Sequence, residues 1–203
     1  PSVNAGPDLT ICFGENTTII ASGSGTFAWT PTTALSCTAC PTPVANPTAT
    51  TSYTVSITAS CGTSSDSVRV IVNPLPIVTV TGTNTICNGQ STTIAAGGAS
   101  TYVWSPSGSL NNANISNPTA NPSVSTNYTV TGTNGNGCVN TTTYSVTVNA
   151  TPTVSVSGIN TICNGQSTTI TAGGAISYVW SPGTGLSNTT IANPAANPVT
   201  STN

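Results

Sequence analysis

The chain repeats itself with a period of about 75 residues, and this constrains its fold more than any other feature. The decapeptide Thr-Ile-Cys-Asn-Gly-Gln-Ser-Thr-Thr-Ile stands at 85–94 and again at 161–170, and a diverged copy stands at 10–19. Residues 83–127 match residues 159–203 at 31 of 45 positions. Self-similarity at a fixed period is the signature of a repeat architecture. The chain therefore has to fold as a series of similar small units.

Two proline-containing segments, Asn73–Pro76 and Asn149–Pro152, mark the boundaries between the copies. The predicted repeats are 1–74, 75–150 and 151–203. The third copy stops at Asn203, which aligns with Asn127, and so lacks the last two strands of the unit. Because open sheet edges promote aggregation, we expect the polypeptide to continue beyond this residue.

Short runs of Val, Ile, Tyr and Trp alternate with Thr and Ser, a pattern of period two that predicts β-strands. In the second copy the expected strands are 77–81, 91–95, 101–104, 127–133 and 141–148. Asn88-Gly89 predicts a hairpin, because a type I′ turn needs positive φ at both central residues. The predicted fold class is all-β, with tandem immunoglobulin-like sandwiches joined by short linkers into an extended rod.

The near-absence of charge excludes several functions. The charged residues are Asp8, Glu15, Asp66 and Arg69, and the chain has no His and no Lys. The usual general base and metal-binding imidazole are therefore missing, and we predict no catalytic, cofactor-binding or metal-binding residues and no enzyme activity. Nucleic acid is not expected as a partner, because its phosphates are neutralised by Lys and Arg. No apolar stretch approaches the roughly 18 residues that a membrane span needs.

The cysteines fall at equivalent places in the copies. Cys12 and Cys61 are 49 positions apart, and Cys87 and Cys138 are 51 apart, so we expect each pair to form a disulfide within its repeat. The partner of Cys163 is then expected near position 214, beyond the last residue. Disulfides of this kind indicate a compartment outside the cytoplasm.

Cys37 and Cys40 form a separate Cys-Thr-Ala-Cys motif in the first copy. A redox dithiol would need a strand-helix context, and a zinc site would need two further ligands. A local disulfide needs nothing more, and is the favoured interpretation. Cys40 aligns with Ile115 and Ile191, which predicts that it contributes to the core.

Five aromatic residues are predicted to lie in the cores: Trp29, Trp104, Trp180, Tyr53 and Tyr128. Each tryptophan lies 17 residues after the first cysteine of its copy and precedes Thr-Pro or Ser-Pro. A tryptophan that stacks on sugars is the alternative interpretation. Because large apolar side chains are scarce here, the core assignment is favoured.

The sequence resembles a known family in the motifs Ile-Cys-x-Gly, Tyr-Val-Trp-Ser-Pro, Gly-Leu-Ser, Asn-Pro-x-Ala-Asn-Pro and Tyr-Thr-Val-Thr. These look like the tandem Ig-like or PKD-like repeats of large secreted surface proteins of Bacteroidota, including adhesins exported by the type IX system. The resemblance implies surface exposure, an adhesive or structural role and no catalytic residues. The C-terminal sorting domain of such proteins is absent from these 203 residues.

Asp66-Ser67-Val68 matches the Asp-Ser/Thr-aliphatic sequence that Bacteroidota O-glycosylate, which makes Ser67 a candidate site. The alternative is a solvated strand residue. The Asn-x-Ser/Thr sequons follow from composition alone, and no function is assigned to them.

The leading hypothesis is an extracellular structural or adhesive rod or filament at the bacterial cell surface. A nearly neutral surface favours association with other copies of the same repeat, because no charge repels them. The alternative hypothesis is a carbohydrate- or ice-binding module that uses Thr-rich faces such as 141–143, with surface glycans as partners.

Overall fold

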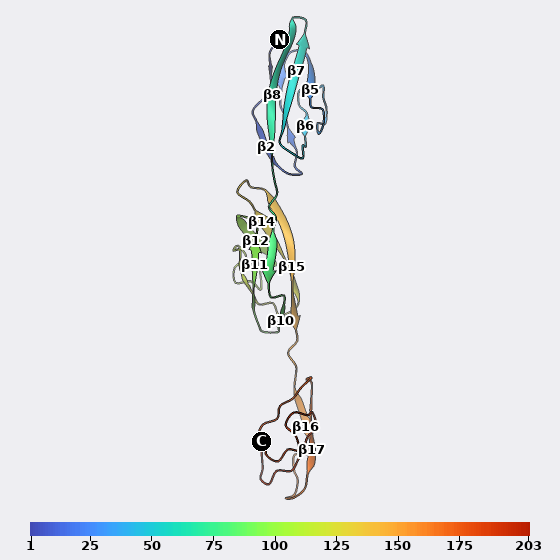
Figure 1. The fold of residues 1–203 in the computed structure, drawn as a ribbon, viewed down its shortest axis with the longest axis vertical. Coiled ribbons are helices and arrows are strands. Elements are labelled where there is room, and N and C mark those ends of the chain that lie inside the picture. The colour runs from blue at the N-terminus through green and yellow to red at the C-terminus, as the bar shows by residue number, and fades with distance from the viewer. The chain divides into compact units, whose positions relative to one another are not determined.

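The computed structural model describes the whole chain, residues 1–203, as two compact units, Pro1–Val148 and Asn149–Asn203. Both units are built from β-strands and the loops between them (Figure 1). No helix of the length and apolarity needed to cross a bilayer is present. The predicted all-β fold class is confirmed.

The first repeat is a sandwich of two layers. One layer is a four-stranded sheet in the order β2-β8-β7-β5, in which β2 runs parallel to β8 and the other neighbours are antiparallel. The other layer consists of the short antiparallel pairs β1–β4 and β3–β6. The strands are β1 (Val3–Asn4), β2 (Leu9–Cys12), β3 (Thr17–Thr18), β4 (Ser22–Gly23), β5 (Thr26–Thr30), β6 (Val44–Ala45), β7 (Thr51–Ala59) and β8 (Gly62–Asn73).

The core of the first repeat lies between these layers. Side chains alternate across β7, so that Tyr53, Val55 and Ile57 are buried while the hydroxyl residues between them lie on the outer face. Trp29 of β5 is 3% exposed and belongs to the same cluster. The opposite layer contributes small and branched residues, namely Ala5, Ile19, Ala21 and Ala45.

The second repeat has the same two layers. The sheet β10-β15-β14-β12 corresponds to β2-β8-β7-β5, and the sheet β13-β11-β9 faces it. Tyr128, Val130, Val146 and Trp104 from the first sheet pack on Ile94 and Ala120 from the second. The strands are β9 (Thr79–Gly82), β10 (Thr85–Cys87), β11 (Thr92–Gly97), β12 (Thr101–Ser105), β13 (Thr119–Ala120), β14 (Thr126–Thr133) and β15 (Val139–Asn149).

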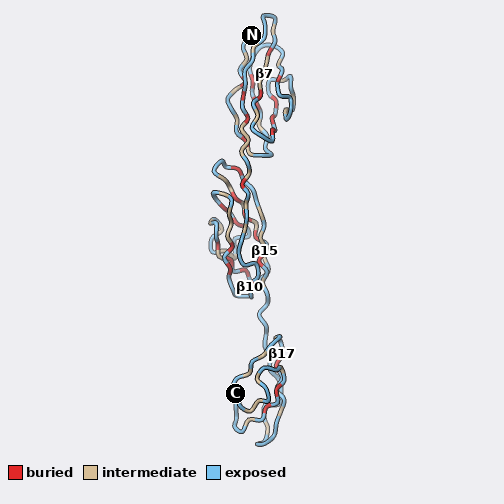
Figure 2. Tube along the Cα trace, viewed as in Figure 1, coloured by how far each residue is buried: buried red, intermediate tan, exposed pale blue.

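This topology is that of an immunoglobulin-like sandwich. A tryptophan on β5 or β12 lies on the strand next to the central β7 or β14, as on the third strand of an immunoglobulin domain. The disulfide that joins the two sheets of antibody domains is absent from both cores, where apolar side chains take that place. Figure 2 shows buried residues in the interior of each sandwich, alternating along the strands with exposed ones.

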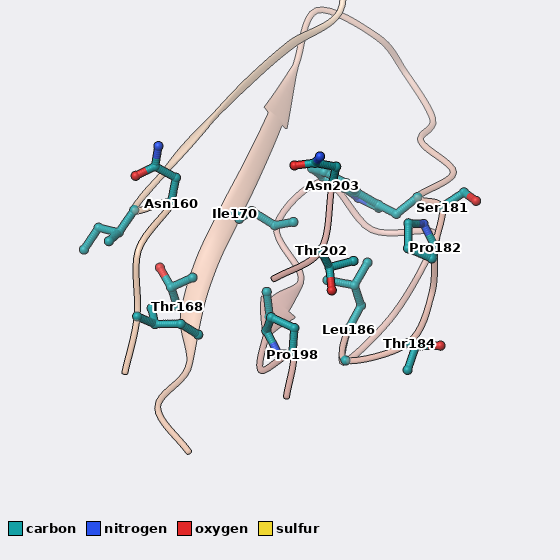
Figure 3. A pocket seen from close by; sticks show the side chains of 15 residues that line it. Asn160, Thr168, Ile170, Ser181, Pro182, Thr184, Leu186, Pro198, Thr202 and Asn203 are labelled. Carbon is teal, nitrogen blue, oxygen red and sulfur yellow. The ribbon is translucent and has the colours of Figure 1, made fainter. Parts of the chain in front are cut away.

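The second unit contains only one layer of a sandwich. Its sheet has the order β16-β17-β18, with β16 (Ser155–Gly158), β17 (Thr168–Gly173) and β18 (Ala195–Ala196). This sheet corresponds to β9-β11-β13 in the second repeat. Of the apolar residues that would form its core, only Ala172 and Ala196 are buried. Trp180 and Ile170 are half-buried and line an open hollow of about 400 Å³ (Figure 3).

The hairpin predicted at Asn88-Gly89 is wrong. Gly89 has a φ of 85°, but Asn88 does not have positive φ, so the turn is not of type I′. The turn joins β10, which lies beside β15, to β11 in the opposite sheet. Ile86 and Ile94 thereby enter the same core from opposite layers.

Candidate functional site

The first and second repeats are joined by a disulfide between Cys12 and Cys138. Cys12 ends β2 in the first repeat, and Cys138 directly precedes β15 in the second. Their Cα atoms are 5.5 Å apart and 126 positions apart in sequence. Cys138 is fully buried, in contrast to the exposed residues of the loop before it. The bond therefore cross-links two consecutive repeats.

The predicted disulfides Cys12–Cys61 and Cys87–Cys138 are both wrong, because the two cysteines of one repeat lie at opposite ends of its sheet. Cys61 lies in the β7–β8 turn, directly before Gly62, the first residue of β8. Cys12 pairs with Asn73, the last residue of β8. The 12 residues of β8 span roughly 35–40 Å at about 3.3 Å per residue. A disulfide requires Cα atoms within about 7 Å.

The linker between the repeats is fixed by side chains of the second repeat. The Asn134 Nδ2 atom donates a hydrogen bond to the Pro74 carbonyl oxygen at 2.9 Å. The Asn140 Nδ2 atom donates one to the Pro76 carbonyl oxygen at 3.0 Å. Asn134 and Asn140 lie on either side of Cys138 in the sequence, so the disulfide and the two hydrogen bonds to the linker lie close together. We call it the junction, consisting of Cys12, Asn73–Pro76, Asn134, Cys138 and Asn140.

Cys61, Cys87 and Cys163 are free and exposed. Cys87 and Cys163 lie in the same turn sequence as Cys12, and Cys61 lies at the hairpin tip that corresponds to the loop before Cys138. The two hairpins differ in length, since Ser60 and Cys61 form the first turn whereas residues 135–137 form the second. No group of three or more His, Cys, Asp or Glu residues is arranged to hold a metal ion.

Cys37 and Cys40 form a disulfide, with Cα atoms 6.0 Å apart. Cys40 is half-buried and so contributes only partly to the core. Its carbonyl oxygen accepts a hydrogen bond of 2.9 Å from Trp29 Nε1. Trp104 and Trp180 make the same bond to Ile115 and Ile191, which places Cys40 in the position that the alignment predicted.

The predicted core aromatics divide between the two units. Trp29, Trp104, Tyr53 and Tyr128 are buried, whereas Trp180 is half-buried because the second unit has one layer. Burial raises the pKa of the Tyr53 phenol, whose hydroxyl donates a hydrogen bond to the Thr33 carbonyl oxygen at 3.2 Å. None of the four buried rings presents a face for stacking on a sugar.

Ser67 is exposed on β8, where its Oγ atom lies 2.9 Å from the Thr54 Oγ1 atom. The neighbouring Asp66 accepts a hydrogen bond from the Ala5 backbone N–H at 2.8 Å, which attaches the N-terminal segment to the sheet. The backbone N–H groups of Ala5 and, secondarily, Ser67 hold the pKa of the Asp66 carboxyl below its usual value. Ser67 therefore lies on an accessible face, and its glycosylation remains a prediction.

Residues with hydroxyl groups occupy most positions of a grid on the outer face of both large sheets, and Ala28, Val103 and Val139 are the exceptions. In each repeat three strands contribute three residues apiece, and cross-strand pairing aligns them in rows. In the first repeat the rows are Thr26, Thr58, Thr63; Ala28, Ser56, Ser65; and Thr30, Thr54, Ser67. In the second they are Thr101, Thr133, Val139; Val103, Thr131, Thr141; and Ser105, Thr129, Thr143. We call these faces the hydroxyl grids.

No protein-family model and no curated protein matches the sequence. Solved structures that match include titin domains I67-I69, at 15% identity and a TM-score of 0.44, covering 96% of this chain and 87% of that one. Extracellular domains 3-5 of Drosophila OTK match at 12% identity and a TM-score of 0.42, covering 70% of this chain and 59% of that one. The insect immune protein hemolin matches at 16% identity and a TM-score of 0.38, covering 73% of this chain and 46% of that one.

These solved structures are tandem immunoglobulin proteins or fragments of them. The chain spans about three fifths of the OTK fragment and less than half of hemolin. At such identities and TM-scores the likeness carries no argument about function. The junction is the feature of this chain that bears on its function.

Proposed function

We propose that the chain is a non-catalytic structural or adhesive repeat protein that works outside the cell as a stiff rod or filament. Its repeats are 1–74, 75–150 and 151–203, and its main partners are further copies of the same repeat. The single observation that carries this proposal is the disulfide between Cys12 and Cys138. A bond that links consecutive repeats has a direct mechanical effect.

The mechanical effect follows from the covalent path through the chain. Tension applied at the two ends passes through the disulfide and bypasses the 125 residues that lie between two cysteines separated by 126 positions. The segment from Phe13 to Gly137, which contains most of both sandwiches, is thereby protected from being pulled out. The linker Asn73–Pro76 is the only backbone connection between the two repeats, and the disulfide provides a second covalent connection in parallel with it.

Stiffness at the junction has a second source. The linker contains two prolines, and its carbonyl oxygens at Pro74 and Pro76 are bound by Asn134 and Asn140. Proline restricts φ, and each hydrogen bond removes a further degree of freedom. The disulfide adds a covalent connection between Cys12 of the first repeat and Cys138 of the second. Bending between these repeats then requires breaking the hydrogen bonds and distorting a covalent bridge.

Stretching single molecules by both ends tests this function. Under oxidising conditions the disulfide leaves only residues 1–12 and 138–203 in the extended path, so the full extension is about 270 Å at about 3.5 Å per residue. A reductant should release roughly 430 Å more. The Cys12→Ser/Cys138→Ser double variant is the control and should reach the long extension without reductant. Equal extension of the native chain with and without reductant would refute the proposal that the disulfide carries the tension.

The hydroxyl grids favour a second candidate function, binding to surface glycans or to ice. Neighbouring strands lie about 4.8 Å apart and alternate residues of one strand about 6.6 Å apart, so the hydroxyl groups of each grid are regularly spaced except at Ala28, Val103 and Val139. A glycan array and a thermal-hysteresis assay distinguish these ligands. Thr131→Lys places a charge at the centre of the second grid, and together with Ser56→Lys at the centre of the first grid it should abolish either activity without affecting the junction.

A further inference from the structure

The junction between the first two repeats contains one turn cysteine and one hairpin cysteine, and the chain carries further turn cysteines without partners. We propose that Cys87 is half of a second junction, which takes the hairpin cysteine of the repeat that follows it. By the same rule, Cys163 of the third repeat bonds to the hairpin cysteine of a fourth repeat. This inference rests on the proposed structural function and adds the rule that sets its cross-links: the turn cysteine of each repeat bonds to the hairpin cysteine of the next.

The turn around Cys87 reproduces the turn around Cys12. The backbone N–H three residues after the cysteine donates to its carbonyl oxygen in all three copies, at 3.0 Å for Cys12, 2.9 Å for Cys87 and 3.0 Å for Cys163. The glycine two residues after the cysteine has φ of 88°, 85° and 83° in the same order. The thiol that is bonded in the first repeat therefore has a matching geometry in the other two.

The strand beside this turn also matches. In the first repeat β8 ends at Asn73 opposite Cys12, and the linker starts at Pro74. In the second repeat β15 lies beside β10 and ends at Asn149, where the second linker starts. Cys87 thus lies at the end of its sheet from which the next repeat leaves. Its exposed thiol is the counterpart of the bonded Cys12.

The expected occupant is an immunoglobulin-like repeat whose hairpin carries a cysteine as the second repeat does. Asn203 aligns with Asn127, and Cys138 lies 11 positions after Asn127. A hairpin of the same length placed after Asn203 would bring its cysteine 127 positions from Cys87, compared with 126 for the bond already present. The distance along the chain therefore fits the same junction.

The cross-link forms by thiol–disulfide exchange with an oxidised low-molecular-weight disulfide such as glutathione disulfide. One thiolate attacks the reagent and releases one glutathione, and the second thiolate displaces the other. The two protein sulfurs are oxidised, the reagent is reduced to two thiols, and the two protein protons go to these thiols. Because Cys87 lies within the loop closed by Cys12 and Cys138, successive cross-links overlap and every boundary between repeats is spanned by a disulfide.

The test extends the full chain by a second copy of residues 128–150 after Asn203. The native chain should show three reactive thiols and the extended chain two, because Cys87 bonds to the appended copy of Cys138. Folding takes place in a glutathione redox buffer, and the bonds are identified by peptide mass spectrometry without reduction. The matched control carries Ser in place of the appended cysteine and should again show three reactive thiols.

A bond between Cys163 and the appended cysteine would overturn the proposal, as would an appended cysteine that stays free. A Cys12→Ser variant of the native chain provides a second test that needs no added segment. Cys138 should then stay unpaired, giving four reactive thiols, and a Cys87–Cys138 bond would overturn the rule. The same mass-spectrometric experiment shows whether Cys12 and Cys138 are bonded in the extended chain. Loss of the Cys87 bond alone would contradict the pairing rule, and loss of the Cys12–Cys138 bond would contradict the proposed function.

Discussion

The turns at Cys12 and Cys87 have nearly the same sequence and the same backbone conformation, yet only Cys12 is bonded. Cys12 meets a buried hairpin cysteine of the following repeat, whereas Cys87 is exposed. The difference between the two thiols therefore lies in what adjoins each turn. Cys12 and Cys138 therefore join two repeats, whereas the Cys37–Cys40 disulfide lies within the first one.

Removing the bond at Cys12 makes the two turns equivalent, and it should have the largest effect on stability. A disulfide that closes a loop of 126 positions contributes about 5 kcal/mol in the chain-entropy model. We expect the Cys12→Ser/Cys138→Ser variant to lose stability of that order, measured by guanidinium unfolding. Cys87→Ser is the matched control at the equivalent turn and should unfold like the native chain. An unchanged double variant would contradict the cross-link.

Asn140 contributes to the junction through a hydrogen bond and not through the disulfide, so a variant of Asn140 measures the linker contact separately. Asn140→Ala removes the hydrogen bond to the Pro76 carbonyl oxygen and should cost about 1 kcal/mol of unfolding free energy. Asn136→Ala, in the exposed loop of the same hairpin, is the control and should cost less than half as much. Equal losses in the two variants would show that the linker contact is not stabilising.

The smallest expected effect is a pH dependence confined to the first repeat. Backbone hydrogen bonds, first from Ala5 and then from Ser67, lower the pKa of Asp66 in the folded state. Its stabilising contribution is therefore complete above the ordinary carboxyl pKa near 4 and is lost as the pH falls through the lower folded value. The register places Thr142, which does not titrate, at the corresponding position of the second repeat.

Thermal unfolding at pH 7 and at pH 2.5, monitored for each repeat by its own tryptophan, measures this difference. Trp104→Phe leaves Trp29 to report on the first repeat, and Trp29→Phe leaves Trp104 to report on the second; Trp180→Phe is present in both. The first repeat should lose more stability in acid than the second. Asp66→Asn should remove the excess loss, and an equal acid response in the two repeats would contradict the role of Asp66.

Much of the fold was predictable from the sequence because each signal was local. The alternation in 127–133 and 141–148 located β14 and β15 to within two residues, and the position of Trp104 before a proline located the end of β12. The two-residue strands β3, β6 and β13 were not predicted, because their pairing depends on the opposite layer. Periodicity cannot reveal a strand that short.

The cysteine pairing could not be predicted from spacing. In a tandem repeat, Cys12 has a candidate partner in its own copy, Cys61, and another in the next copy, Cys138. Both pairings agree with the regular spacing of the cysteines. The deciding information is the direction of β15. The turn at Gly135–Gly137 places Cys138 at one end of that strand, and the linker after Asn149 lies at the other. Because Cys87 lies at the linker end, the length of β15 keeps the two cysteines apart.

Digestion with trypsin tests the Cys12–Cys138 bond, because Arg69 is the only Lys or Arg in the chain and lies inside the loop that Cys12 and Cys138 close. The free thiols are first alkylated, and the chain is then unfolded without reductant and digested. We expect one species with the mass of the alkylated chain plus one water, which separates into residues 1–69 and 70–203 only on reduction. Separation without reduction, as Cys12–Cys61 and Cys87–Cys138 bonds would allow, would contradict it.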